Sequence, residues 1–223
     1  MIDFTDKVVV VTGAAGALGS AVVANFETLG AKVAGLDIAE QPGIMHCDLF
    51  DPESCVAAVT RVCDQYAGID ILVNVAGGFA MGEAVHETSA GTWQLMHDLN
   101  AGSVLHMAQA VVPAMLQARA GKIVNIAARA GLRGAAGMGA YVASKSVVIR
   151  LTETLSEELR GSGINVNCVL PSIIDTPANR AAMPDADFRQ WVAPASLAGV
   201  IGFLASDLAR DVHGAALPVE GLS

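Results

Sequence analysis

The sequence predicts a single α/β domain, 1–223, built on a Rossmann-type, doubly wound parallel β-sheet of about seven strands with helices on both faces. Short β-branched runs alternate with longer helical patterns along the chain, which is the order of strand–helix–strand units. Apolar residues make up 53% of the 223 residues, an excess that a sheet buried on both faces would explain. The length suits one sizeable domain better than two small ones.

Each strand is expected where Val, Ile and Leu cluster without polar alternation, as is typical of parallel strands covered on both sides. These runs are 7–11, 32–36, 44–47, 71–75, 122–126, 164–169 and 215–219. Helices are expected between them at 17–29, 52–66, 92–116, 141–160 and 194–205, with the long 92–116 helix broken near Asn100. Glycine or proline stands at many of the joints between elements, which supports these boundaries.

Composition argues against several classes of function. The net charge is −9 and basic runs are absent, so we expect no nucleic-acid partner and no anionic membrane surface. The start of the chain lacks a signal-peptide layout and the longest apolar run is short, so we expect a soluble, cytoplasmic protein that acts on a small molecule. The four cysteines have no ligand spacing and are expected to be buried thiols. We expect no metal site, because the histidines lack companion ligands; they are His86, His97, His106 and His213.

A glycine-rich turn, TGAAGALGS, follows the first predicted strand. Gly13, Gly16 and Gly19 would let the backbone approach a pyrophosphate, and the amides of Ala17 and Leu18 open the next helix. Unpaired amides and the helix dipole favour negative charge there. The turn therefore predicts a dinucleotide site, although glycine and alanine there could also serve tight packing alone.

Two acidic residues bear on the choice of cofactor. Asp37 ends the second strand, where a carboxylate can accept hydrogen bonds from an adenosine ribose and repel a 2′-phosphate. NAD(H) is therefore favoured and NADP(H) is not excluded, the alternative being a turn role for Asp37. Asp48, followed by Leu49, comes after the third strand, where it could receive the adenine amino group or cap the following helix.

Tyr141 and Lys145 lie four residues apart in YVASK, so a helix would place them on one face. The lysine charge would favour the phenolate and lower the tyrosine pKa, and the lysine could also reach ribose hydroxyls. The plainer alternative is a core tyrosine beside a solvated lysine.

These segments, together with NVAG at 74–77, Asn100 in DLNAGS, PSIIDT at 171–176 and VHGAALPVEG near the end, resemble the short-chain dehydrogenase/reductase family over nearly the whole chain. The resemblance implies nicotinamide-dependent hydride transfer in a homodimer or homotetramer. It implies Tyr141, Lys145 and Asn100 as catalytic residues, with Asn100 holding water beside Lys145. The implied cofactor contacts, besides those of the glycine turn, Asp37, Asp48, Leu49, Tyr141 and Lys145, are Asn74, Ala76, Gly77, Pro171, Ile174 and Thr176.

Three positions depart from the family pattern. Ala17 and Ser172 stand where the family usually has glycine, and Ala128 stands where it has the catalytic serine. That serine orients the substrate oxygen, and loss of one such donor can raise the barrier by roughly 3 kcal/mol. A quinonoid or imine-like ring would need less help than a simple carbonyl, with Tyr141 supplying the proton.

A narrower resemblance points the same way. GALGS, VAGGFAMG at 75–82 and DTPANRAAMPDADFRQW at 175–191 are similar to the dihydropteridine reductases, which carry alanine at the serine position and tryptophan where Phe79 stands. Phe79 would offer an aromatic face to the substrate, and 177–193 would form a lid. Met183 and Trp191 would line the pocket or pack within that lid. Arg129 and Arg133 would bind an anionic substrate or lie on a solvated loop.

Three functions therefore compete. The first is an NAD(H)-dependent oxidoreductase acting on a small carbonyl, quinonoid or imine substrate. The second is a conventional alcohol dehydrogenase or 3-oxoacyl reductase in which another group replaces the serine. The third is a cofactor-binding regulator that has lost catalysis.

Overall fold

Seven parallel strands form one sheet in the computed structural model, which describes residues 2–223. Their order across the sheet is β3-β2-β1-β4-β5-β6-β7. Their bounds are β1 Val8–Thr12, β2 Lys32–Asp37, β3 Ile44–His46, β4 Ile71–Asn74, β5 Gly121–Ile126, β6 Ile164–Pro171 and β7 Ala216–Val219. The predicted fold class is confirmed, and each strand boundary lies within two residues of its expected place.

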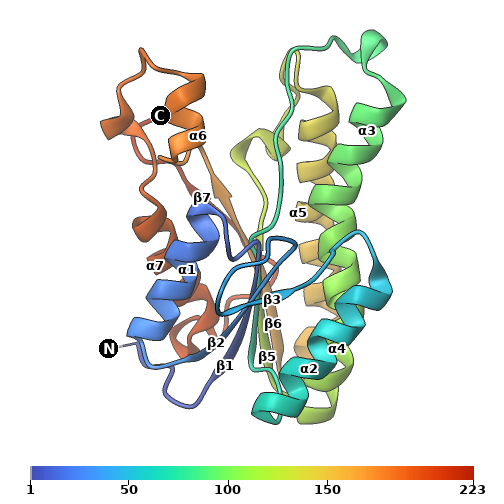
Figure 1. Cartoon of the computed structure of the whole chain (residues 1–223), viewed down its shortest axis with the longest axis vertical. Helices are drawn as coiled ribbons and strands as arrows, with labels where there is room; N and C mark the ends of the chain where they lie inside the picture. Colours follow the sequence, from blue (N-terminus) through green and yellow to red (C-terminus); the bar gives the residue numbers. More distant parts are fainter. Residues whose placement is uncertain (1) are drawn as a thin grey trace.

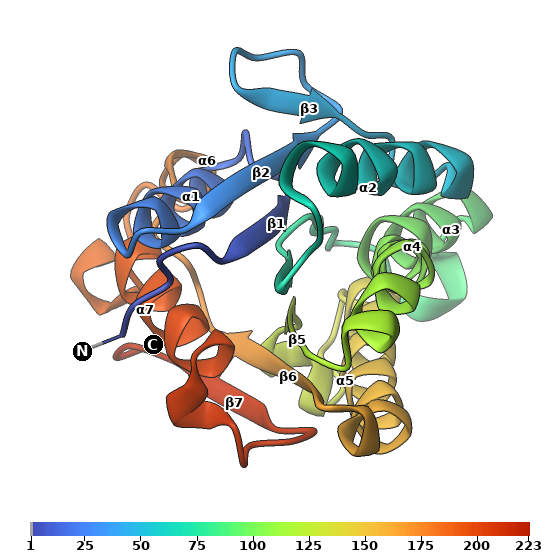
Figure 2. The same cartoon turned by 90° about the horizontal axis from the view of Figure 1, so that it is seen from below.

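Helices cover both faces of the sheet (Figures 1 and 2). On one face lie α1 (Ala17–Thr28) and α7 (Pro194–Ala205); on the other lie α2 (Pro52–Tyr66), α4 (Ser103–Ala118) and α5 (Gly139–Leu159). Alternate residues of β1 enter different cores: Val9 and Val11 pack with Phe26 of α1, whereas Val8 and Val10 pack on the side of α2 and α4. This two-sided burial explains the unbroken valine run.

The predicted break near Asn100 is a π-helical turn, Asp98–Gly102, between α3 (Ala90–His97) and α4. The whole helical run, Ala90–Ala118, is long and apolar enough to cross a membrane by length and composition alone. Of its most apolar window, 44% is buried inside the domain, and a single helix of this kind is weak evidence for a membrane span. A further short helix, α6 (Pro177–Ala182), lies in the predicted lid and was not expected from the sequence.

The strand order reverses direction between β1 and β4. The chain builds β2 and β3 on one side of β1, then returns to place β4 on the other side, with Thr12 opposite Asn74 in the register. In doubly wound sheets, ligands bind at the carboxyl ends of the strands on either side of such a reversal. The glycine turn and the segment after Asn74 therefore share one crevice.

Candidate active site

The glycine turn after β1 brings backbone against backbone. Gly13 has a positive φ of +64°, and a Cβ there would lie 2.9 Å from Cα of Ala76. A Cβ on Gly19 would lie 2.0 Å from the carbonyl oxygen of Gly13. Gly16 caps α1, and within residues 2–223 this cap has no side-chain hydrogen bond. The first amides of α1 therefore have no capping side chain, which is the condition for an anion to bind them.

Asp37 lies at the end of β2, beside this turn. Its Oδ2 accepts a hydrogen bond from the Ala15 amide at 3.0 Å, and its Oδ1 accepts one from the Ala39 amide at 3.0 Å. The turn role that the sequence left open is therefore present. A carboxylate has about four acceptor sites, so these two bonds leave capacity for a ribose hydroxyl.

Asp48 follows β3, and its Oδ1 accepts from the Phe50 amide at 2.9 Å. The suggested helix-cap role for Asp48 is wrong, because the cap of α2 is Asp51, which accepts from the Glu53 amide at 2.9 Å. Two residues of loop, Leu49 and Phe50, separate the two acids, and the sequence offered no way to choose between them. The carbonyl of the neighbouring Leu49 contacts the His106 ring at 2.8 Å, which anchors this loop to α4.

The end of β4 is fixed in part by Thr12 and Asn125, which the sequence did not single out. Thr12 Oγ1 accepts from the amides of Val75 and Ala76 at 3.0 and 3.2 Å. Asn74 donates to Oδ1 of Asn125 at 2.8 Å, while its own Oδ1 is buried without a partner among the described residues. These contacts hold the Asn74–Gly77 segment at the crevice.

Tyr141 and Lys145 lie in the first two turns of α5, and Asn100 approaches them from the π-helical turn. Asn100 Nδ2 donates to Oγ of Ser144 at 3.0 Å and to the carbonyl of Gly78 at 3.1 Å. A Cβ on Gly77 would lie 2.8 Å from Asn100 Oδ1 and 3.1 Å from Lys145 Nζ. The glycine thus keeps open the space between these two side chains.

The pKa values of Tyr141 and Lys145 correct one prediction made from the sequence. Burial raises the pKa of Tyr141 to about 12, and burial lowers the pKa of Lys145 to about 8. The sequence predicted that Lys145 would lower the tyrosine pKa; instead Lys145 Nζ donates to the carbonyl of Ile126 at 2.9 Å, and desolvation dominates at the phenol. Helical spacing alone could not reveal this, because it fixes a shared face and not the partner of a long side chain.

Ala128 is buried just past β5, at the start of the 3-10 turn Arg129–Leu132. Phe79, on the loop after β4, packs its ring edge-on against the Tyr141 ring, with centroids 4.9 Å apart. Phe79 is nevertheless 56% exposed, so much of its surface is free to contact a substrate beside Tyr141.

The 177–193 segment begins at α6, which Thr176 caps by accepting from the Asn179 amide at 3.2 Å. The Asn179 side chain donates to the carbonyl of Ile174 at 2.8 Å. Trp191 is buried against Phe188, with ring centroids 4.8 Å apart, so it packs within this segment. Met183 ends α6 and is half-buried. The backbone returns to the sheet edge through a bridge between Ile174 and Val192.

The last residues, 220–223, join three segments around the crevice, which the sequence did not predict. Arg129 donates to the carbonyl of Ser223 at 3.1 Å and to Glu220 at 3.4 Å. Ser172, at the end of β6, donates to the carbonyl of Glu220 at 2.6 Å. The Leu222 amide donates to the carbonyl of Gln190 at 2.9 Å. No local sequence signal marks such contacts between residues so far apart.

The structure also locates the remaining residues named from the sequence. Pro171 ends β6 and is buried, and Arg133 lies exposed on the loop that follows the 3-10 turn. All four cysteines are free thiols. Over residues 2–223, groups of three or more His, Cys, Asp or Glu side chains that could hold a metal ion are absent.

Comparison with known proteins gives consistent matches. A family model described as short chain dehydrogenase matches residues 7–187. The chain is 32% identical to 2-(R)-hydroxypropyl-CoM dehydrogenase of Xanthobacter autotrophicus, covering 96% of this chain and 97% of that protein. It is 32% identical to the 3-oxoacyl-[acyl-carrier-protein] reductase FabG of Thermotoga maritima, covering 96% of each. The crystal structure of gox2181 superposes with a TM-score of 0.93 at 28% identity, covering 99% of this chain and 96% of that chain.

Proposed function

The chain belongs to the short chain dehydrogenase family, and from this premise we propose that it is an NAD(H)-dependent oxidoreductase that uses Tyr141 as its proton donor and acceptor. One observation carries the proposal. The crevice at the strand reversal brings the glycine turn to one side and Tyr141, Lys145 and Asn100 to the other, with Gly77 between Asn100 and Lys145. Oxidoreductase activity is common to the dehydrogenases and the reductase that the chain resembles.

The residues fit a dinucleotide. Side chains at Gly13 and Gly19 would collide with backbone, so glycine there keeps the turn tight and lets it approach a pyrophosphate. The uncapped start of α1 offers amides for the phosphates, and Asp37 retains acceptor capacity for a ribose hydroxyl. The carboxylate favours NAD(H) over a 2′-phosphorylated cofactor. We also propose, from the family resemblance, that the Ile174 backbone and Thr176 contact the nicotinamide carboxamide; the backbone hydrogen bonds to Val192 use Ile173 and Asp175 instead.

A bound nicotinamide supplies or accepts the hydride; the protein residues position the substrate and move one proton. Because burial raises the Tyr141 pKa to about 12, the phenol is protonated at neutral pH and is in the form that donates. In the same proposal Lys145, whose Nζ donates to the Ile126 carbonyl, binds ribose hydroxyls of the cofactor, while burial keeps the Tyr141 pKa raised. Asn100 holds the Gly78 backbone and Ser144 in place, and the family resemblance implies that it would hold water beside Lys145.

Ala128 limits the class of substrate that this site can orient. Its methyl cannot donate a hydrogen bond, so the substrate must be oriented by contacts other than a serine hydroxyl. The exposed face of Phe79 beside Tyr141 suits a flat ring. We therefore favour a conjugated quinonoid or imine substrate, as in dihydropteridine reductases, for a cytoplasmic homodimer or homotetramer. The 177–193 segment would close over it as a lid, with Met183 toward the substrate.

Tyr141→Phe tests the proposal. The variant should lose at least a hundredfold in turnover, in the range typical of general acid catalysis, while its NADH dissociation constant, measured by fluorescence, changes little. Full activity in this variant would overturn the assignment of Tyr141. Loss of activity together with loss of NADH binding would also contradict it, because Tyr141 would then be needed for cofactor binding and not for proton transfer.

A conventional alcohol dehydrogenase or 3-oxoacyl reductase is the second candidate, favoured by the activities for which the two relatives are named. Here Ala128→Ser should speed reduction of simple carbonyl compounds by about a hundredfold, the magnitude of one restored oxyanion donor. Under the conjugated-substrate proposal the same change should alter the true substrate's rate less than threefold. A catalytically silent NAD-binding regulator is the third candidate, and the retained Tyr141, Lys145 and Asn100 argue against it.

A further inference from the structure

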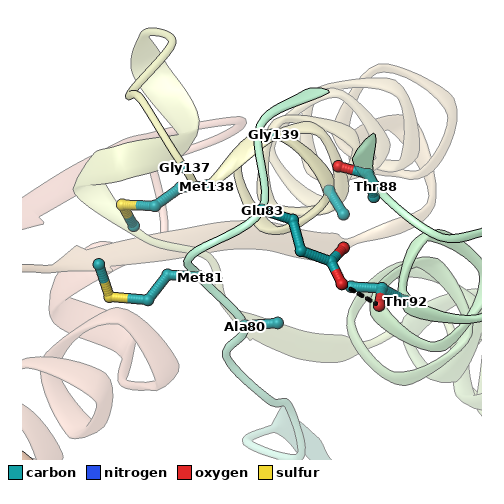
Figure 3. A pocket seen from close by; sticks show the side chains of 9 residues that line it. Ala80, Met81, Glu83, Thr88, Thr92, Gly137, Met138 and Gly139 are labelled. Carbon is teal, nitrogen blue, oxygen red and sulfur yellow. Dashed lines mark hydrogen bonds between the residues drawn. The ribbon is translucent and has the colours of Figure 1, made fainter. Parts of the chain in front are cut away.

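A pocket of about 140 Å³ lies next to the proposed proton donor, outside the residues assigned above. Its walls come from the loop after β4, from the approach to α3 and from the turn just before α5 (Figure 3). Ala80 of this pocket directly follows Phe79, and Ala140 directly precedes Tyr141. A hydrogen bond from the Gly82 amide to the Gly137 carbonyl, 2.8 Å long, ties the two loops together beside it. The pocket is thus adjacent in the chain to both rings of the Phe79–Tyr141 pair.

Its lining is divided by chemistry. The thioethers of Met81 and Met138 lie on one side, and the side chains of Glu83, Thr88 and Thr92 lie on the other (Figure 3). Water takes about 30 Å³ per molecule in the liquid, so the pocket holds a group of several heavy atoms. A substrate tail entering it would meet apolar sulfur and methyl groups on one face and oxygen atoms on the other.

The oxygen atoms on the polar side present acceptors only. The Thr88 hydroxyl donates its proton to the Ala84 carbonyl at 3.1 Å. The Ser89 hydroxyl donates to Thr92 Oγ1 at 3.0 Å, and Thr92 in turn donates to Glu83 Oε1 at 3.5 Å. A carboxylate has no proton to give. These hydroxyl protons have acceptors within the protein, so the side chains on the polar side face the pocket with lone pairs and one negative charge, while the first backbone amides of α5, which have no capping side chain, also line it.

Helix capping is the competing explanation for Glu83, since its Oε2 accepts from the Ser89 amide near the start of α3. That bond is 3.3 Å long, and the contact with Thr92 is 3.5 Å, both at the weak end of hydrogen-bond geometry. Ser89 itself already caps α3 by accepting from the Thr92 amide at 2.9 Å. Capping therefore uses little of the acceptor capacity of Glu83.

We propose that this pocket, which we call the Glu83 pocket, binds the non-reacting end of the substrate and selects a group that donates hydrogen bonds, a hydroxyl or an ammonium. A carboxylate or phosphate in the same place would meet the negative charge of Glu83 and the lone pairs of the threonines, and the donors it could use are the backbone amides of Gly139 and Ala140 at the start of α5. The inference rests on the proposed function in one respect: it takes the Phe79–Tyr141 pair as the place where the substrate reacts.

Binding can be measured without turnover. With methionine methyls labelled with ¹³C, meso-erythritol and ethanolamine should shift the Met81 and Met138 signals, whereas glycerate at the same concentration should not. Glu83→Gln should weaken ethanolamine at least fivefold and erythritol less, since only the ammonium loses an ion partner. Glu87→Gln is the matched control: Glu87 is exposed on the same loop, its carboxylate lies 3.9 Å from His86 Nε2, and it is not among the residues that line the pocket.

The two proposals fail separately. Equal shifts with glycerate, absence of shifts with either donor compound, or identical titrations of wild type and Glu83→Gln would overturn the Glu83 pocket, even if the enzyme oxidises NADH. If donor binding follows the prediction while Tyr141→Phe keeps full activity, the pocket stands and the assignment of Tyr141 fails. Once a substrate is known, Glu83→Gln should raise KM for a hydroxylated substrate over its carboxylated analogue and leave kcat unchanged.

Discussion

The two sides of the crevice are built differently. On the cofactor side, the glycine turn and β4 meet through backbone atoms, and Gly13 and Gly19 leave no room for a side chain. On the proposed substrate side, the walls are side chains from segments far apart, Ala128 after β5 and Phe79 after β4. Backbone contacts tolerate few residue types, whereas side-chain walls can change without altering the fold. Departures from the family pattern occur on both sides, at Ala17 and Ser172 as well as at Ala128, and of these three Ala128 is the one that removes a hydroxyl.

The largest effect is expected where the cofactor side is tightest. In Gly19→Ala the new methyl would lie 2.0 Å from the Gly13 carbonyl oxygen, so the turn must open. We expect a loss of about 1–3 kcal/mol in the free energy of unfolding and at least a hundredfold weaker NADH binding. Calorimetry and fluorescence titration measure the two. Gly199→Ala, where a methyl meets nothing within 4 Å, is the control, and equal behaviour of the two variants would contradict backbone packing as the cause.

The second effect is a pH dependence of stability that arises from the buried side chain of Lys145. Burial holds its pKa at about 8, below the ordinary 10.5, so between those values the unfolded chain binds more protons than the folded one. Stability attributable to Lys145 therefore rises with pH across this window, by about 3 kcal/mol for a shift of this size.

Lys145→Met removes this titration. The free energy of unfolding of the wild type, relative to the variant, should increase from pH 8 to pH 10.5 in denaturant titrations. Lys32→Met, at a lysine whose side chain is 52% exposed, should give a flat difference. A flat difference for Lys145→Met as well would mean that the buried ammonium is compensated by more than the Ile126 carbonyl.

Much of the fold was predictable because its signals are local. The unbroken apolar runs located the strands, and the break at Asn100 was seen in advance. The positions of the site residues were predictable, but their hydrogen-bond partners were not. Thr12, Ser144 and the Ile126 carbonyl come from segments that only the fold brings together. The error on the Tyr141 pKa has the same origin, because desolvation depends on everything packed around the ring.

A third, smaller effect separates two roles of Asp37, which binds the turn amides and is proposed to read the ribose. Asp37→Asn keeps an acceptor and removes the charge. If the charge repels a 2′-phosphate, the ratio of NADPH to NADH dissociation constants should fall about tenfold, equivalent to roughly 1.4 kcal/mol. Parallel weakening of both cofactors, with the ratio unchanged, would assign Asp37 to the turn alone.

The smallest effect is expected on the substrate side, at the 220–223 segment. Gly221 has a φ of +60°, and a Cβ there would lie 2.7 Å from the Gln190 carbonyl oxygen. Gly221→Ala should cost about 1 kcal/mol locally and speed hydrogen exchange at Gln190 and Trp191, with a KM rise of a few-fold. Gly161→Ala, in open space, is the control. Unchanged exchange at Trp191 would show that 220–223 does not hold this segment.

The most direct test of the central claim is the NADH oxidation rate of the wild-type protein across a panel of quinonoid, imine and simple carbonyl compounds, quinonoid dihydropterin included. The account predicts turnover with at least one compound, faster for conjugated acceptors than for simple ketones, and loss of that turnover in Tyr141→Phe. Tight NADH binding with no oxidation on any compound would contradict it and would make the chain a cofactor-binding protein without catalysis.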